Sequence, residues 1–421
     1  MPRFPESKMS ARKEILVKIR CNINLARVKA IMSEHTRREF IGTTVAAGAA
    51  FAFSSVPGSD ASPAPTTTLM PTQRSKELMT LFGLKYPIFE APHGARNTRP
   101  ELAIAVSNAG AMGALALTDH TPDSARDAVS KVRAATKGAF FINYILEFPF
   151  ESGAASLQAA LDAGAPIAQF SWGLPPKEAI SAIRAAGAKL GMQVTSRESA
   201  KAALDLGADY LVCQGTEAGG HVQATRGLYE ALPQVLEEAK QKPVIASGGI
   251  GNGVGIRKAL FAGASAAMLG TRFVATIESN GHSAYKQAIL AAHAQDTALT
   301  VCFQDGWPAT HRALRNRTFV LWDAAGCPPP GKRPGEGEAV ATRPDGSKVL
   351  RYDWRSPFRG MEGAVTECAM YAGLSVDFIK DLPAAGELVE RLWQECIAAH
   401  NITGGTAPRF PKRSKDVKMR R

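Results

Sequence analysis

Cysteine is scarce in this 421-residue sequence, and the cysteines that occur lack metal-binding spacing. No CxxC pair is present, and the six are Cys21, Cys213, Cys302, Cys327, Cys368 and Cys396. Zinc sites and iron–sulfur clusters usually show closely spaced cysteines, so the pattern predicts no metal site. It is also unlike the dense disulfide framework of small secreted domains. The sequence alone leaves open a single disulfide bond among the four C-terminal cysteines.

Long apolar runs are also missing from the sequence. The most prominent uncharged stretch is Ile41–Phe53, which is rich in Ala, Gly and Thr. A helix that crosses a bilayer needs about 20 mostly apolar residues. The sequence therefore predicts no permanent membrane span.

The body of the chain has almost no net charge, because the formal charge of +12 is concentrated at the two ends. Residues 1–40 hold ten Lys and Arg against four acids, and residues 406–421 hold seven against one. These basic ends lack interleaved aromatic residues, so nucleic-acid binding is not expected. Residues 401–421 are predicted to be a basic disordered tail, with an anionic surface as an alternative partner.

The front end has the three regions of an export signal. The pair Arg37-Arg38 precedes the uncharged run, and a Ser/Pro/Ala/Thr linker follows at Ser54–Thr68, with a small-residue cleavage point near Ala61. This order is typical of a twin-arginine signal. We therefore expect residues 1–68 to be read by the twin-arginine export machinery, which makes the mature protein periplasmic or secreted. The alternative is a short buried helix preceded by two surface arginines.

The charged region of this signal is unusually long. It includes residues 1–31, and Met32 lies just ahead of the arginine pair, so a translation start at Met32 is left open. The twin-arginine route carries folded proteins, so a cofactor could be inserted in the cytoplasm before export.

From Leu84 onward, short apolar runs alternate with Ala-rich amphipathic stretches. The expected strands are Tyr86–Ala91, Met112–Leu117, Phe140–Ile145, Ile167–Ser171, Lys189–Thr195, Tyr210–Gln214, Val244–Ser247 and Ala266–Gly270. The expected helices include Pro100–Asn108, Asp123–Thr136, Lys177–Ala186, Arg197–Leu206 and Gly255–Ala262. This spacing favours an α/β fold, a closed (β/α)8 TIM barrel, over an open parallel sheet, which periodicity alone does not exclude. Ala-Gly steps after several helices predict glycine C-caps, as at Gly110, Gly187, Gly207 and Gly263.

The carboxyl ends of the expected strands carry the polar and glycine residues. In a TIM barrel this end holds the active site, and the loops after strands seven and eight frequently bind phosphate. Those loops contain Gly248-Gly249 and Gly270-Thr271. Glycine lets the backbone approach a ligand closely, so adjacent loops of this kind predict a phosphate site. Tight turns without a ligand are the alternative.

Two amides and a histidine would face the same mouth. Asn143 and Gln214 can both donate and accept hydrogen bonds, which suits the edge of a flavin, although each could instead cap local backbone. His221 follows Gly219-Gly220 and could accept a proton at neutral pH. A solvated loop histidine is the alternative.

Several blocks resemble the nitronate monooxygenase (2-nitropropane dioxygenase) family. They are "YPIFEAPHGARNTRPELAIAVSNAGAMGALAL", "FFINY", "QFSWGLP", "ADYLVCQGTEAGGHVQ" and "KPVIASGGIGNGVGIRKALFAGASAAMLGTRFVATIES", followed by Arg312–Asn316 and "MYAGLSVDFIKDLPAAGELVERL". The resemblance implies bound FMN and a catalytic His221. The implied cofactor-binding set is Pro92, His93, Gly94, Asn143, Gln214, Gly219, Gly220, Gly248, Gly249, Met268, Leu269, Gly270 and Thr271.

The same resemblance implies an activity and a domain plan. The activity is oxidation of nitronates or nitroalkanes by dioxygen to a carbonyl compound and nitrite. His221 would take the α-proton of a nitroalkane, or as imidazolium would hold the oxygens of a nitronate. An FMN-binding barrel core at 75–275 would precede a capping segment at 276–363 and a return to the barrel at 364–400. The oligomeric state is left open, a homodimer included.

The sequence departs from the family pattern at three places. Glu90 and His93 stand where the family usually shows Gln and Met, Val222-Gln223 replace a small continuation, and the insert Asp323–Lys348 is long. These departures bear on the substrate. Rival interpretations are a flavin-dependent enoyl-thioester reductase, which tends to carry an acid at the position of Gln214, an exported flavin-binding protein without turnover, and a flavin-free phosphosugar isomerase.

Overall fold

The computed structural model describes residues 71–94, 99–147 and 150–399. The predicted signal region at 1–68 and the predicted tail at 401–421 lie outside these residues. The described residues up to 321 and from 335 to 399 belong to one compact unit, which contains the barrel and the candidate site, and residues 322–334 belong to a second. Within the described ranges, none of the helices combines the length and apolarity needed to cross a membrane.

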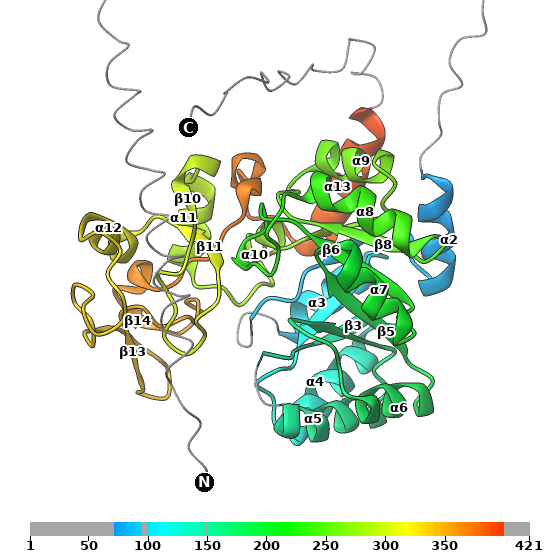
Figure 1. The fold of residues 1–421 in the computed structure, drawn as a ribbon, viewed down its shortest axis with the longest axis horizontal. Helices are drawn as coiled ribbons and strands as arrows, with labels where there is room; N and C mark the ends of the chain where they lie inside the picture. The colour runs from blue at the N-terminus through cyan, green and yellow to red at the C-terminus, as the bar shows by residue number, and fades with distance from the viewer. Residues whose placement is uncertain (1–70, 95–98, 148–149, 400–421) are drawn as a thin grey trace, which may run out of the picture. The chain divides into compact units, whose positions relative to one another are not determined.

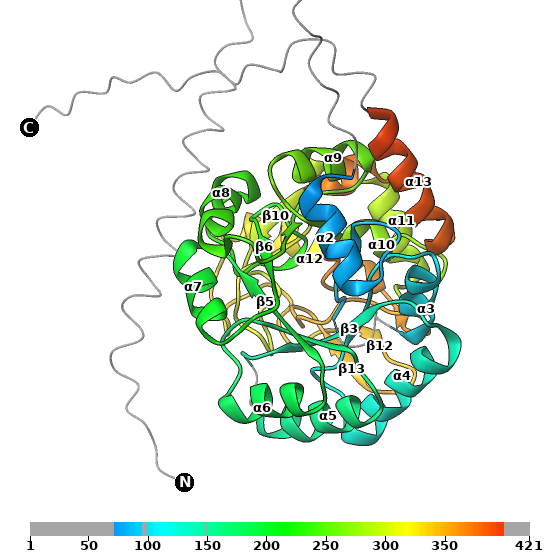
Figure 2. The same cartoon turned by 90° about the vertical axis from the view of Figure 1, so that its right-hand side faces the viewer.

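Eight parallel strands form the barrel, in the order β1-β9-β8-β6-β5-β4-β3-β2. They are β1 (Ile88–Glu90), β2 (Gly113–Ala116), β3 (Phe140–Ile145), β4 (Ile167–Ser171), β5 (Lys189–Val194), β6 (Tyr210–Gln214), β8 (Val244–Ser247) and β9 (Ala266–Leu269). Each predicted strand is present with ends within two residues of the prediction. The predicted TIM barrel is therefore confirmed, and Figure 2 shows its helices arranged around the strands.

Strand β1 is short, and a side chain helps to close the ring between β1 and β2. The Met112 N–H donates to the Ile88 carbonyl and the Glu90 N–H donates to the Met112 carbonyl, both at 2.9 Å. One residue pair further along, the Ala114 N–H donates to Glu90 Oε2 at 3.1 Å. The buried Glu90 carboxyl thus takes the place of a backbone carbonyl where β1 has ended.

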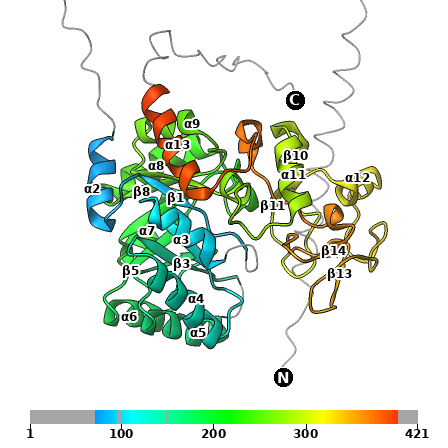
Figure 3. The same ribbon diagram turned by 180° about the vertical axis from the view of Figure 1, so that it is seen from behind.

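Helices alternate with these strands and cover them. They are α3 (Pro100–Asn108), α4 (Pro122–Ala135), α5 (Phe150–Asp162), α6 (Lys177–Ala185), α7 (Arg197–Asp205), α8 (Leu228–Ala239), α9 (Gly253–Phe261) and α13 (Ala385–Ala398). The predicted glycine C-caps are confirmed, because Gly110, Gly187, Gly207 and Gly263 all have positive φ. Helix α13, from the end of the described chain, lies beside α9 and α3 (Figure 1 and Figure 3).

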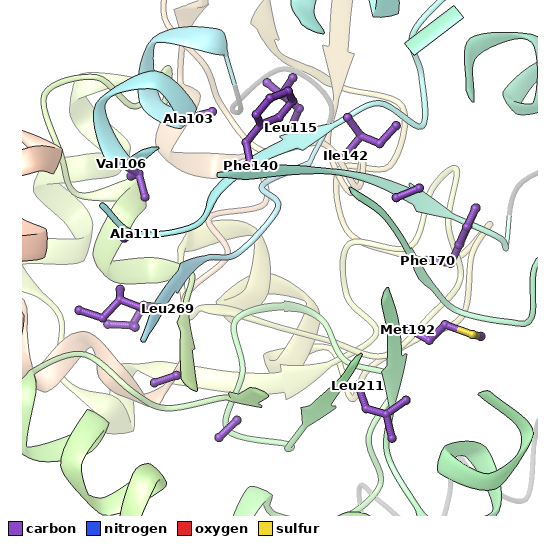
Figure 4. Close-up of a cluster of buried hydrophobic side chains, with 14 of the residues drawn as sticks. Ala103, Val106, Ala111, Leu115, Phe140, Ile142, Phe170, Met192, Leu211 and Leu269 are labelled. Carbon is purple, nitrogen blue, oxygen red and sulfur yellow. The ribbon is translucent and has the colours of Figure 1, made fainter. Parts of the chain in front are cut away.

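Two apolar layers hold the barrel together. The outer layer lies between strands and helices and includes Leu115, Phe140 and Phe170 (Figure 4). The inner layer fills the barrel with side chains such as Phe89 and Tyr210. Leu78 of helix α2 (Gln73–Phe82) belongs to the inner layer, so α2 packs against the barrel interior.

Gly191 on β5 makes room for the largest of the inner side chains. A Cβ at this position would lie 2.1 Å from the Tyr210 ring. The absence of a side chain at Gly191 lets Tyr210 cross the barrel, where its hydroxyl donates to Gln169 Oε1 at 3.0 Å. A tyrosine buried in this way needs such a partner.

The smaller elements, most of which follow the last barrel strand in sequence, are together named the cap. One antiparallel sheet contains β7 (Gly220–His221), β10 (Thr297–Thr300) and β11 (His311–Leu314), and another contains β12 (Ala339–Thr342), β13 (Lys348–Leu350) and β14 (Glu362–Gly363). The remaining helices are α10 (Thr271–Val274), α11 (Ser283–Ala291), α12 (Arg317–Ala324) and 3₁₀ turns at Ala294–Asp296, Val365–Glu367 and Leu374–Phe378. Because β7 comes from the barrel loop after β6, the first cap sheet includes the predicted catalytic histidine.

Candidate active site

A large cavity opens at the carboxyl ends of the barrel strands. Its empty volume, which includes the open space at the mouth, is about 1560 Å³. Glycine and polar residues from the strand ends line one part, and aromatic residues, most of them from the cap, line another. The cavity therefore brings residues of the barrel loops and residues from outside the barrel to one site.

The structure brings nearly all the predicted site residues to this cavity. Its lining includes Pro92, His93, Gly94, Asn143, Gln214, Gly219, Gly220, His221, Gly248, Gly249, Met268, Gly270 and Thr271. Leu269 is different, because its side chain packs in the outer apolar layer. Its carbonyl accepts a hydrogen bond from the Ala91 N–H at 2.9 Å, and a cofactor contact by Leu269 stays a prediction.

The glycines after β8 form a cradle that side chains would fill. Gly248 and Gly249 have φ values of +126° and +69°, which favour glycine. A Cβ on Gly249 would lie 2.9 Å from the Glu217 Cβ. Close by after β9, Thr271 Oγ1 accepts a hydrogen bond from the Gly373 N–H at 3.0 Å, so its own hydroxyl proton can be donated to a ligand. This arrangement fits a phosphate group.

A chain of buried hydrogen bonds orients the amide of Asn143. Gln169 Nε2 donates to Asn143 Oδ1 at 3.0 Å, and Gln169 in turn accepts from Tyr210. Asn143 Nδ2 then faces Ser171, whose Oγ lies 3.4 Å away and which also lines the cavity. The amide is thereby held with its N–H groups toward the strand ends, as donation to a heterocycle requires.

Gln214 has the alternative role that the sequence left open, because its amide hydrogen-bonds local backbone. Its Nε2 donates to the His221 carbonyl at 3.3 Å, and its Oε1 accepts from the Gln223 N–H at 2.9 Å. Both ends of the amide therefore fix the loop that carries His221. A flavin contact by Gln214 stays a prediction.

His221 is packed among aromatic rings at the boundary between the barrel and the cap. It pairs with His311 across β7 and β11. Its ring stacks on Trp307, with centroids 3.6 Å apart and planes 16° apart, and the Tyr371 ring lies 5.2 Å away. Among the described residues, buried His221 Nε2 has no hydrogen-bond partner. This nitrogen is thus left for a ligand.

The surroundings of His221 keep it neutral. Burial, with a smaller contribution from His311, lowers the pKa of His221 well below 6.5, because a charged imidazolium loses its hydration. Burial also lowers the pKa of His311 to about 4, and the backbone N–H of Phe303 donates to His311 Nε2 at 3.2 Å. Neither histidine supplies a positive charge at neutral pH.

Glu90 and His93, the two departures in the first block, form a buried pair. Glu90 Oε1 lies 3.6 Å from His93 Nδ1, and His93 Nε2 lies 3.0 Å from the Gly270 carbonyl oxygen. Burial raises the pKa of Glu90. The imidazole of His93 consequently bridges the ends of β1 and β9 at the cavity wall.

Sequence reasoning missed several cavity residues. Trp172 and Tyr371 were inside quoted blocks without an assigned role, whereas Trp307 and Trp354 were in none, and Trp307, Trp354 and Tyr371 follow no strand of the barrel. They reach the cavity from cap loops, where no periodic pattern marks them. Gln223 was noted only as a departure, whereas its side chain joins β4 and β5 to the histidine loop.

Comparison with known proteins agrees with this geometry. A family model described as "Nitronate monooxygenase" matches residues 75–395. The chain belongs to the nitronate monooxygenase family. A curated nitronate monooxygenase of Pseudomonas aeruginosa is 32% identical over 362 residues, which are 75% of this chain and 97% of that protein.

Solved structures are similar as well. A nitroalkane oxidase from Streptomyces ansochromogenes has 30% sequence identity and a TM-score of 0.62, covering 77% of this chain and 99% of the other. FabK from Thermotoga maritima has 24% identity and a TM-score of 0.61, covering 77% and 97%. The second likeness shows the shared fold alone.

Proposed function

We propose that this member of the nitronate monooxygenase family binds FMN and uses dioxygen to convert nitronates and nitroalkanes to carbonyl compounds and nitrite. The observation that carries the proposal is a glycine cradle, an oriented amide and a neutral buried histidine on one cavity. In overall balance, two nitronate anions and one dioxygen give two carbonyl compounds and two nitrite anions. The family match supports the same activity.

The residues present fit FMN. The backbone of Gly248 and Gly249 and the hydroxyl of Thr271 would hold its phosphate, and Asn143 Nδ2 would donate to the edge of its ring. Bound FMN supplies the capacity to take electrons from the substrate and return them to dioxygen. The backbone at Pro92–Gly94 lies on the same wall.

His221 would act on the substrate proton. Its Nε2 is buried, and the depressed pKa keeps it ready to accept the α-proton of a nitroalkane at neutral pH. A nitronate has already lost that proton, so it needs only to be positioned. The lowered pKa argues against the alternative in which an imidazolium holds the nitro oxygens.

A spectroscopic experiment tests cofactor and reaction together. Purified protein should show flavin absorption bands that ethyl nitronate bleaches without oxygen and that air restores, with nitrite released. A yellow protein that no nitronate bleaches would contradict the activity and leave the cofactor in place. A colourless protein that FMN does not reconstitute would contradict the cofactor.

We propose further that the protein is exported through the twin-arginine route. The support is in the sequence, where Arg37-Arg38, the uncharged run Ile41–Phe53 and the linker Ser54–Thr68 follow in the order such signals require. The family match begins only at residue 75, after this segment.

A further inference from the structure

Three of the five tryptophans of the chain meet at the active-site cavity. The ring centroids of Trp172 and Trp307 lie 5.1 Å apart with planes at 68°. Those of Trp307 and Trp354 lie 5.6 Å apart with planes at 89°. The three indoles therefore form a corner of nearly perpendicular aromatic walls. Trp172, Trp307 and Trp354 together make up this indole corner.

The first wall is held by an unusual backbone conformation. Trp172 has φ of +65°, a left-handed value that costs energy for a bulky residue. The backbone N–H of Trp172 donates to Gln223 Oε1 at 3.2 Å, and Gln193 Nε2 donates to the same oxygen at 3.0 Å. Gln223 is thus a positioning residue that ties this wall to the loop of His221.

The wall formed by Trp354 is held from two sides. A Cβ on Gly306 would lie 2.5 Å from Trp354 Cδ1, so the indole packs directly on the glycine backbone. The backbone N–H of Trp354 donates to the Asp305 carbonyl at 3.2 Å, and the Tyr371 hydroxyl donates to the backbone carbonyl of Trp354. Trp354 and Trp307 are both almost fully buried yet line the cavity.

Arg355, a cation in the cavity lining beside the indole corner, is already paired with a carboxylate. Arg355 Nη1 lies 3.3 Å from Asp353 Oδ2, and its guanidinium lies over the Trp354 ring at 5.1 Å. A guanidinium stacked in this way extends a flat surface. The wall is therefore built for contact with a ring.

We propose that this cavity selects nitronates that carry an aryl substituent or a comparably flat, π-rich one. Aromatic rings prefer offset-stacked or edge-to-face neighbours at centroid distances of about 4.5–7 Å, and the indole corner offers both a face and an edge. The nitro end would lie toward His221, which stacks on Trp307. A short alkyl nitronate would leave the walls without a partner. The proposal rests on the proposed function, whose site it specifies.

The first test compares turnover of two nitronates. Wild-type holoenzyme should show a higher kcat/KM for the nitronate of phenylnitromethane, which yields benzaldehyde and nitrite, than for the nitronate of nitroethane. Trp354→Leu should lower the aryl value by roughly threefold to tenfold more than it lowers the value for ethyl nitronate, the worth of one aromatic contact. Trp172→Leu should do the same. Trp393→Phe, in the outer apolar layer, is the matched control and should preserve the preference.

Three results would overturn the proposal. They are a wild-type preference for ethyl nitronate, a preference for the nitronate of 3-nitropropionate, and an equal loss for aryl and ethyl nitronates in both tryptophan variants. Urea unfolding midpoints close to that of the wild type show that each variant is folded. A preference for the carboxylate-bearing compound would instead assign the wall to Arg355.

A binding experiment separates this proposal from the proposed function. Nitrobenzene and 2-methyl-2-nitropropane carry no α-proton and cannot become nitronates, so equilibrium dialysis measures their binding without turnover. Tighter binding of nitrobenzene, weakened in Trp354→Leu, supports the aromatic site even if no nitronate is oxidised. Equal binding of the two compounds would overturn it even if oxidation is observed.

Discussion

His221 takes its chemical character from its neighbours rather than from its place in a motif. Trp307 covers one face of the ring, and His311 is paired beside it across two strands. These neighbours remove water from the imidazole and add no negative charge. A base that must work at neutral pH is favoured by such an environment, because it stays deprotonated there.

A pH profile tests this assignment. A base is active when deprotonated, so activity falls as the pH drops through its pKa, and a lowered pKa moves that fall to more acid solution. We expect kcat/KM for neutral nitroethane to hold its value through pH 6.5 and to fall only below it. His221→Asn should lower nitroethane turnover by about 10²-fold and spare the nitronate far more.

His293→Asn is the matched control, since His293 is exposed and pairs with Asp377 away from the cavity. It should leave the profile unchanged. An acid limb centred above pH 6.5, or full nitroethane turnover in His221→Asn, would remove His221 from the role of base.

For single residues, the sequence predicted which ones lie at the cavity, but it did not always predict the contacts that their side chains make. Gly248 and Gly249 were foreseen because only glycine suits their backbone, and they have that conformation. The amide of Gln214 holds the loop that carries His221, and the spacing of residues in the sequence does not predict this contact. Trp307 and Trp354 were missed because loop residues far apart in sequence meet only through the folded cap.

Among the elements, β5 and β6 show how the barrel interior reaches the site. Tyr210 on β6 passes over Gly191 on β5 and, through Gln169, sets the amide of Asn143. One missing side chain is therefore linked to the orientation of a cofactor-facing group. Both strands were predicted from their apolar runs, but the packing of Tyr210 over its neighbour Gly191 was not.

Replacement of Gly191 by alanine tests this connection. The new Cβ would collide with the Tyr210 ring, and overpacking of this kind costs about 1–3 kcal/mol of unfolding free energy. Urea unfolding measures the loss, and FMN affinity should fall with it. Gly386→Ala in helix α13 is the control, because the nearest atoms to its Cβ would be the Ala105 carbonyl oxygen at 3.8 Å and the Ala109 Cβ at 3.9 Å, and it should stabilise slightly. Equal stability of wild type and Gly191→Ala would refute the collision.

The barrel elements were predictable and the cap sheets were not, for a physical reason. Barrel strands are buried on both faces and alternate with amphipathic helices, so each leaves a clear pattern. Strands such as β7 and β14 span two residues each. Segments this short carry no period, and their pairing depends on partners distant in sequence.

On the scale of the whole molecule, the barrel enzyme is preceded by a segment for which we propose a role in export. The family match covers residues 75–395, and the twin-arginine pair lies well ahead of it. Export of this kind suits a protein that must fold around a cofactor first.

Conservative replacement of both arginines tests the export proposal in the full chain. The double variant Arg37→Lys with Arg38→Lys keeps the charge, and we expect it to stay in the cytoplasm of a bacterium whose twin-arginine route exports the wild type. Arg3→Lys with Arg12→Lys is the matched control and should be exported. Cell fractionation measures both, and normal export of the first variant would contradict the proposal.

The pairing of β7 with β11 has a consequence for the order in which the protein matures. His221 acquires its stacked and buried position only when a barrel loop and a cap strand from a distant part of the chain have joined. Such long-range closures come late in folding. A chain with a finished barrel and an unfinished cap would already cradle a phosphate but would hold no shielded base. The joining of β7 to β11 therefore completes the surroundings that the proposed base needs, as well as the sheet itself.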